Sequence, residues 1–300
     1  MQKNLNKLKG IFPIIYCFFN KNNTLDKKII SEQINLIKQI GSNGIASLGL
    51  ATEVNKLSFK EKKTLIELIA EHVGDSMPTA VTIQGNTFQE YIKLIDVAKK
   101  NNADWIILQP LIKKNTKDKD CYHFFNKLIP YTKDTIVGVQ NAKEYLGVGL
   151  TPKDILQLYS KYENFRAIKG ESSSVFMQNE IKSYPKNLRV FNGRGGQEIV
   201  DNFLIGCRGI VPALDSADKF IKIYKHFQKK DILKANEQYK KILPATVFIM
   251  QSINTMICYG KRICAYRMGI KKIYDRKPFL APTEYGIIKS KQIANNLGVF

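Results

Sequence analysis

The chain has 300 residues, of which 44% are hydrophobic, so it can bury a large core as one big domain or two smaller ones. It contains no run of about 18 apolar residues, which excludes a transmembrane helix, and we expect no membrane partner. The net charge of +21 suggests nucleic-acid binding, but lysines occur in almost every predicted helix, so we expect an anionic small-molecule substrate and no nucleic-acid partner.

The predicted elements alternate between strand and helix from the start of the chain. The apolar run 11–19 follows a lysine-rich segment, but Pro13 and Tyr16 interrupt it and no small-residue cleavage site follows, so we predict a first strand and a cytoplasmic protein. The predicted strands are 11–18, 44–48, 78–83, 103–108, 135–139, 164–169, 188–191 and 209–211. The predicted helices are 26–40, 58–72, 87–100, 120–129 and three that begin near Thr151, Ser173 and Gln197.

Eight strands, each followed by a helix, call for a parallel sheet. Eight such units in residues 1–215 predict an α/β fold, the (β/α)8 TIM barrel, with a doubly wound open sheet as the alternative. No GxGxxG motif or P-loop supports the alternative. Residues 216–300 are predicted to form additional C-terminal helices packed on the barrel, at 220–228, 231–251 (interrupted by Pro244) and 253–268.

The run 164–171, Asn-Phe-Arg-Ala-Ile-Lys-Gly-Glu, places Lys169 at the end of a short apolar strand. A lysine at that position reaches water or is held in a pocket, where the neutral amine becomes a nucleophile toward a carbonyl group. It is the only lysine at a predicted strand end, the functional edge of a barrel. An ordinary surface lysine is the simpler interpretation of this stretch alone.

The other predicted strand ends carry neutral amides and glycine-rich turns. The amides are Gln84, Gln109, Gln140 and Asn141. A lone lysine among amides indicates Schiff-base chemistry on a carbonyl substrate. The turns at Gly49 and 193–196 leave backbone N–H groups free to hold a carboxylate.

Cysteine and histidine patterns predict neither a disulfide framework nor a metal site. The cysteines are odd in number and show no CxxC spacing, and the histidines fall far apart in predicted helices. We therefore expect no metal. The residues concerned are Cys17, Cys121, Cys207, Cys258, Cys264, His72, His123 and His226.

Three segments resemble the dihydrodipicolinate synthase/N-acetylneuraminate lyase family. Residues 10–26 are similar to its opening strand and loop, 44–58 to its Gly-Thr-Thr-Gly-Glu segment, and 167–171 to its Schiff-base lysine strand. Order, spacing and length agree along nearly the whole chain. The resemblance implies a class I pyruvate aldolase barrel in which Lys169 forms an imine with a 2-oxo acid. It also implies a homotetramer and no cofactor other than the covalent imine.

The chain departs from the family pattern at several positions. Leu50 and Ala51 replace the two threonines and Thr52 replaces the second glycine, so the resemblance leaves carboxylate binding to backbone N–H groups around Ala51 and Thr52. Gln140 stands where the family has its catalytic tyrosine and cannot shuttle a proton. Tyr145 replaces the arginine that the synthases use on a dicarboxylate. These departures disfavour dihydrodipicolinate synthase and sialic acid lyase, and indicate a divergent branch.

We therefore expect a lyase that cleaves a 2-keto-3-deoxy sugar acid to pyruvate and an aldehyde. A 2-keto-3-deoxy sugar acid dehydratase and a non-catalytic barrel that binds a 2-oxo acid are the alternatives. Strand alternation places Glu171 on the side of Lys169, as a candidate acid or base. Glu53 is expected to be structural. The predicted substrate-binding residues are Ala51, Thr52, Gln140, Asn141, Gly193 and Val211.

Overall fold

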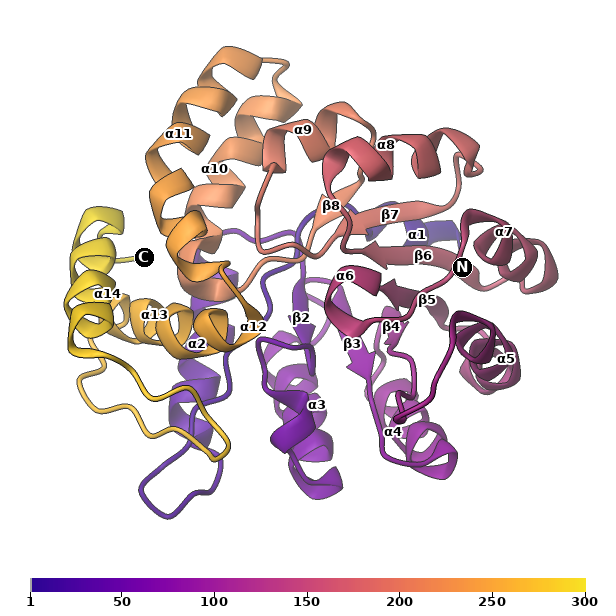
Figure 1. Cartoon of the computed structure of the whole chain (residues 1–300), viewed down its shortest axis with the longest axis horizontal. Coiled ribbons are helices and arrows are strands. Elements are labelled where there is room, and N and C mark those ends of the chain that lie inside the picture. The colour runs from indigo at the N-terminus through magenta and orange to yellow at the C-terminus, as the bar shows by residue number, and fades with distance from the viewer. Residues whose placement is uncertain (1) are drawn as a thin grey trace.

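The short apolar runs form eight parallel strands, paired in the order β1-β8-β7-β6-β5-β4-β3-β2 and surrounded by helices (Figure 1). The computed structural model describes residues 2–300, with side chains from Leu5 onward. The predicted barrel is confirmed. The strands are β1 (Gly10–Ile11), β2 (Ile45–Ser47), β3 (Thr79–Ile83), β4 (Trp105–Leu108), β5 (Ile136–Asn141), β6 (Phe165–Gly170), β7 (Arg189–Asn192) and β8 (Gly209–Ile210).

The predicted first strand, 11–18, is wrong as a continuous strand. After β1 the chain divides its hydrogen bonds between two neighbours. The Ile14 N–H donates to Pro212 O (2.8 Å), whereas the Ile15 N–H donates to Ala46 O (3.3 Å). Ile14 also bridges Ala46 and Ala213. The irregular segment therefore joins β2 to the chain after β8 and closes the barrel.

Four of the barrel helices begin at a residue whose side chain accepts a backbone hydrogen bond from the first turn. They are α2 (Asp26), α3 (Ser58), α4 (Thr87) and α7 (Thr151). Ser58 with Glu61 and Thr151 with Asp154 form capping boxes. The helices are α1 (Gln2–Lys7), α2 (Lys27–Gln39), α3 (Phe59–Val73), α4 (Phe88–Lys100), α5 (Asp118–Leu128), α6 (Lys143–Leu146), α7 (Pro152–Lys161), α8 (Ser174–Ser183), α9 (Ile199–Leu204) and α10 (Ala217–Gln228).

The C-terminal helices gather on one side of the barrel (Figure 1). They are α11 (Ile232–Ile249), α12 (Ile253–Thr255), a π-helical turn (Met256–Gly260), α13 (Lys261–Arg267) and α14 (Glu284–Leu297). Helix α11 continues through Pro244, and α14 was not predicted. Helix α10 begins after the predicted domain boundary at residue 215, but it packs against β1 of the barrel. The boundary stays a prediction.

Within residues 2–300, no single helix is long and apolar enough to cross a membrane. The segments Ile232–Ile249 and Ile253–Arg267 qualify together, by length and composition only, with a bend of 105° between them.

Aromatic rings fill the barrel interior and leave little room except at the strand ends. Phe12, Trp105 and Phe191 meet with ring centroids 4.8–6.5 Å apart. Glycine makes this possible, because a Cβ at Gly44 would lie 2.3 Å from the Phe12 ring and one at Gly209 would lie 2.2 Å from the Phe191 ring. Open space therefore remains at the carboxyl ends of the strands.

Candidate active site

Lys169 lies near the end of β6 with only 4% of its surface exposed. Its strand is paired on both sides, so its backbone is fixed between Gln140 of β5 and Phe191 of β7. The Nζ atom donates a hydrogen bond to Oε1 of Glu171, which is 2% exposed. The structure thus places the predicted nucleophile and the predicted acid or base in direct contact.

Gly193 leaves the space that this pair occupies. A Cβ there would lie 2.7 Å from Glu171 Oε1 and 2.8 Å from Lys169 Cε. The Gly193 N–H donates to Gly170 O (2.8 Å), which fixes the turn directly over the two side chains. A side chain at this position would displace the lysine or the carboxylate.

A chain of amides supports the Glu171 carboxylate. Gln140 donates from Nε2 to Glu171 Oε1 (2.7 Å), and Gln109 donates from Nε2 to Gln140 Oε1 (2.9 Å). A carboxylate accepts and does not donate, so the Gln140 NH₂ group has to face Glu171 and its oxygen has to face Gln109. The three side chains come from consecutive strands or their ends, and all are buried. Gln140 therefore lies against the acid and outside the open pocket.

The pocket in front of Lys169 holds about 440 Å³ of empty space, part of it open to solvent. Residues from the barrel and from the C-terminal helices line it. They are Ile14, Leu50, Ala51, Tyr145, Lys169, Glu171, Gly193, Gly195, Val211, Ala213, Met250, Ile253 and Met256. Of the predicted site residues, the structure brings Ala51, Lys169, Glu171, Gly193 and Val211 together here.

The turn after β2 contributes Leu50 and Ala51 to the pocket lining, and among the described residues neither backbone N–H has an acceptor. The Thr52 hydroxyl donates to Ile15 O (2.8 Å), and the Thr52 N–H donates to Gly49 O (3.1 Å). Both donors of Thr52 are thus used within the protein. Among the described residues, none accepts a hydrogen bond from the Ala51 N–H. Ala51 therefore offers a carboxylate a free donor, and Thr52 does not.

Asn141 fixes the loop that carries Tyr145. Its Oδ1 accepts from the Leu150 N–H (2.8 Å) and its Nδ2 donates to Leu150 O (3.1 Å). This reciprocal pair closes the loop that contains the short helix α6, from which Tyr145 lines the pocket. Asn141 itself does not line the pocket.

A buried tyrosine–aspartate pair lies beside the pocket. The Tyr16 hydroxyl donates to Asp215 Oδ2 (2.8 Å), and Ser216 donates to Asp215 Oδ1 (2.9 Å). Burial raises the pKa of both Tyr16 and Asp215. Asp215 lines a small cavity that shares Met250 with the main pocket. Tyr16 does not line the main pocket, so it does not replace the missing family tyrosine there.

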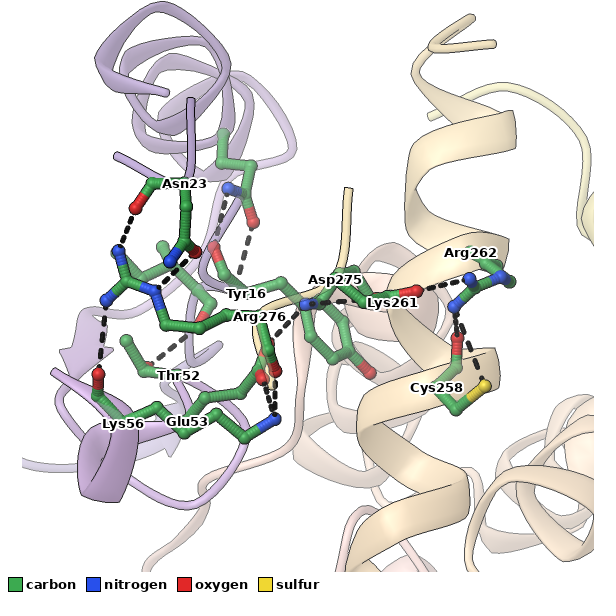
Figure 2. Close-up of polar contacts among 12 residues, drawn as sticks. Tyr16, Asn23, Thr52, Glu53, Lys56, Cys258, Lys261, Arg262, Asp275 and Arg276 are labelled. Atoms are coloured by element: carbon green, nitrogen blue, oxygen red, sulfur yellow. Dashed lines mark hydrogen bonds and ion pairs between the residues drawn. The ribbon is translucent and has the colours of Figure 1, made fainter. Parts of the chain in front are cut away.

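Glu53 does not line the pocket and belongs to a network of charges (Figure 2). It pairs with Lys56 (2.6 Å) and with the fully buried Lys261, whose Nζ is also 3.8 Å from Asp275. Arg262 pairs with Asp275 in turn (2.5 Å). The network joins the turn after β2 to α13, and Glu53 has a structural role, as its sequence position suggested.

Cysteine and metal-ligating side chains do not gather near Lys169. The five cysteines are free and buried, and burial raises the pKa of Cys121 to about 11 and that of Cys207 to about 12. Within residues 2–300, no three His, Cys, Asp or Glu side chains are arranged to hold a metal ion.

The model of the Dihydrodipicolinate synthetase family matches residues 7–295. The chain belongs to this family. Its members and aldolase relatives are lyases, and so is this protein. One relative is Probable 2-dehydro-3-deoxy-D-pentonate aldolase YjhH of Escherichia coli, 26% identical over 87% of this chain and 91% of the relative. Another is 4-hydroxy-tetrahydrodipicolinate synthase of Methanocaldococcus jannaschii, 25% identical over 79% of this chain and 81% of the relative.

Solved structures of the family have the same fold. The Ruminococcus gnavus sialic acid aldolase has a TM-score of 0.89 at 17% identity, with 97% of each chain covered. Dihydrodipicolinate synthase from Rhodopseudomonas palustris has a TM-score of 0.88 at 18% identity, covering 97% of this chain and 98% of its own. At these identities the likenesses bear on the fold alone.

The C-terminal pocket residues were missed by sequence reasoning. Met250, Ile253 and Met256 belong to helices predicted only to pack on the barrel, and nothing in their sequence marks them as lining a site. Tyr145 was noted for the arginine it replaces, and the structure places it in the pocket wall.

Proposed function

We propose that the protein is a class I aldolase that forms an imine between Lys169 and the ketone of a 2-oxo acid. In this reaction the C3–C4 bond of a 4-hydroxy-2-oxo acid is broken or formed. The observation that carries the proposal is the buried Lys169–Glu171 contact at the floor of an open pocket. Family membership supports the lyase chemistry independently.

The first step needs a neutral amine and a place for its proton. Glu171 Oε1 lies in hydrogen-bond contact with Lys169 Nζ, so it can accept one lysine proton as the amine attacks C2. Glu171 passes this proton to the C2 oxygen, then accepts a second proton from the carbinolamine nitrogen and delivers it to the C2 hydroxyl. The hydroxyl leaves as water, and the cationic imine forms with Glu171 again a carboxylate. Gln140 holds the carboxylate but carries no titratable proton.

The imine then accepts the electron pair of the broken bond. Glu171 removes the proton from the C4 hydroxyl, the C3–C4 bond breaks, and its electrons form an enamine on the lysine while the aldehyde departs. Protonation at C3 and hydrolysis by one water molecule return pyruvate and free Lys169. The Ala51 N–H, which has no acceptor among the described residues, is the donor we assign to the substrate carboxylate.

The 2-keto-3-deoxy sugar acids are one group of 4-hydroxy-2-oxo acids. The Escherichia coli relative named as a pentonate aldolase supports this group loosely, at 26% identity. Loss of the C4 hydroxyl as water would make the same imine a dehydratase intermediate. The homotetramer and the cytoplasmic location stay predictions, and light scattering in solution tests the first.

Reductive trapping tests the proposal. Incubation with pyruvate and sodium borohydride should add one reduced pyruvyl group, located at Lys169 by peptide mapping. The Lys169→Ala protein should stay unmodified. A wild-type protein that keeps its unmodified mass would rule out the imine. If trapping succeeds, the products formed from a 4-hydroxy-2-oxo acid separate the alternatives. Release of pyruvate and an aldehyde indicates an aldolase, and loss of the C4 hydroxyl as water indicates a dehydratase. If neither reaction occurs, the protein binds a 2-oxo acid without converting it.

A further inference from the structure

Most of the side chains that line the pocket are apolar. Lys169 and Glu171 carry charged groups. Among the described residues that line the pocket, Tyr145 is the only other one with a polar side chain. The aliphatic and thioether side chains form what we call the apolar wall. They include Leu50, Met250, Ile253 and Met256.

Three polar side chains near the pocket, those of Thr52, Asn141 and Arg194, hold hydrogen bonds within the protein that would have to break if they turned toward a ligand. The Thr52 hydroxyl is bound to Ile15 O, and the Asn141 amide is bound to Leu150. Arg194 Nη1 is bound to Glu198 (3.0 Å). None of these groups lines the pocket.

The composition of the lining decides what the rest of a substrate meets. An imine at Lys169 commits C2 to the lysine, and the carboxylate takes the Ala51 N–H, so C4 and the carbons beyond it are left with the mostly apolar remainder of the lining. A sugar chain would bring one hydroxyl per carbon into this wall, and Tyr145 can satisfy only one or two hydrogen bonds. A buried hydroxyl without a partner is unfavourable, whereas a methyl group in its place gains from burial.

From this we propose that the carbon chain beyond C4 is apolar, and that the substrates are 4-hydroxy-2-oxo acids with an alkyl or aryl group on C4. The inference rests on the proposed imine chemistry. It replaces the expected sugar acid with a 4-hydroxy-2-oxo acid whose carbon chain is apolar beyond C4. In the forward direction, the enamine carbon of pyruvate attacks the aldehyde carbon and forms the C3–C4 bond. The aldehyde oxygen takes up a proton, and water releases the product from Lys169, so no further reagent is consumed.

A matched pair of aldehydes tests this inference. Glyceraldehyde and 2-methylbutanal have the same skeleton, with two hydroxyls of one replaced by methyl groups in the other. With pyruvate in excess and the free carbonyl forms at equal concentration, we expect kcat/KM for 2-methylbutanal to exceed that for glyceraldehyde by at least ~100-fold, the scale on which an apolar pocket rejects a hydroxyl. The adducts are measured by mass spectrometry.

Borohydride trapping with pyruvate alone is run beside the aldehyde assay. Trapping together with the 2-methylbutanal preference supports the inference. Trapping with equal or better use of glyceraldehyde, or with no use of either aldehyde, overturns the inference and leaves the imine proposal intact. Failure to trap pyruvate overturns both, and so the two failures are distinguishable.

A variant pair adds an internal control. Met250→Gln is close to isosteric and places an amide in the apolar wall, so the aldehyde ratio should move about tenfold toward glyceraldehyde. Val247→Gln introduces the same amide on α11, where Val247 is 49% exposed and outside the pocket, and should leave the ratio unchanged. If Met250→Gln and Val247→Gln change the aldehyde ratio equally, Met250 does not contact the carbon chain of the substrate.

Discussion

Within residues 5–300, two lysine–carboxylate pairs have both partners buried, and they differ in what surrounds them. Lys169 contacts Glu171 at the end of β6, and Lys261 contacts Glu53 between the turn after β2 and α13 (Figure 2). The lysines are 4% and 0% exposed. Burial and pairing are therefore common to both, and neither property alone identifies the reactive residue.

The difference lies in the remaining contacts of each carboxylate. Glu53 also binds Lys56, and Lys261 lies near Asp275, so each member of that pair has a second partner of opposite charge. Glu171 is held by the neutral amide of Gln140 and faces a pocket. A pair set in a charge network stabilises the fold, whereas a pair set among amides beside open space is free to exchange a proton with a ligand.

The largest expected effect follows removal of the nucleophile. Lys169→Met should lower kcat for aldol cleavage by at least ~10⁴-fold, on the scale seen when a covalent nucleophile is removed. It should also abolish borohydride trapping of pyruvate. Circular dichroism checks that the variant remains folded. A Lys169→Met protein with near wild-type turnover would place the imine on another lysine.

The second effect concerns the proton carrier. Glu171→Gln keeps an oxygen for the Gln140 N–H but removes the base, so kcat should fall by ~10²–10⁴-fold, the usual contribution of general acid–base catalysis. Slow trapping of pyruvate should persist, because Lys169 remains. Glu53→Gln is the matched control and should change the thermal midpoint more than kcat. If Glu53→Gln lowers kcat more than Glu171→Gln does, the assignment of Glu171 as the proton carrier and of Glu53 as structural is wrong.

The third effect is on stability. Lys261→Met leaves Glu53 with one cation fewer in a buried site, which costs ~3–5 kcal/mol when one partner of a buried pair is removed. The thermal midpoint should fall by roughly 6–10 °C. The folded fraction should still trap pyruvate at Lys169. Denaturant unfolding measures the loss, and an unchanged midpoint would show that the network contributes little to stability.

Much of the barrel was predictable from the sequence, because each strand is a short apolar run bounded by turn residues. Seven of the eight strands lie where the sequence places them, to within about two residues. The first failed as a continuous strand because Ile14 and Ile15 bond to opposite neighbours, an arrangement with no local sequence signal. Helix α14 was not predicted, although its apolar periodicity is no weaker than that of α8 and α11, which were.

The site was predictable only where it follows from strand ends. Lys169 and Glu171 belong to one strand and its extension, so alternation placed them together. The bonds of Thr52 and Asn141 to backbone atoms depend on loop conformation, which residue type does not specify. Long-range packing brings Met250 to the pocket, and no pattern within α11 indicates it.

The fourth effect tests the amide support of Glu171. Gln140→Met removes the N–H that donates to the carboxylate, a charge-assisted bond worth ~1.5–3 kcal/mol, so kcat should fall by about 10- to 150-fold. A positioning role should also displace the pH–rate profile, whereas KM for pyruvate should change little. Gln109→Met lies one bond further away and should have the smaller effect. A change in stability without a change in the pH–rate profile would make Gln140 structural only.

The smallest effect lies at the rim of the charge network, where Arg276 pairs with Glu61 (2.7 Å). Burial raises the pKa of Glu61, but hydrogen bonds from Arg276 and Ser58 outweigh it, and the pKa lies below its ordinary value of 4.5. A carboxyl with a lowered folded-state pKa contributes stability above its unfolded-state pKa, and loses that contribution as the pH falls through the folded-state value. Glu61→Gln should therefore reduce stability by about 0.5–1 kcal/mol at pH 7, after solvent screening, and by nothing at a pH below both values. Urea unfolding from pH 7 down to pH 3 should show the wild-type and variant curves converging at the acid end. If the two stability curves stay parallel from pH 7 to pH 3, the Glu61–Arg276 contact acts through packing. The charge of Glu61 would then contribute nothing to the stability of the network around Lys261.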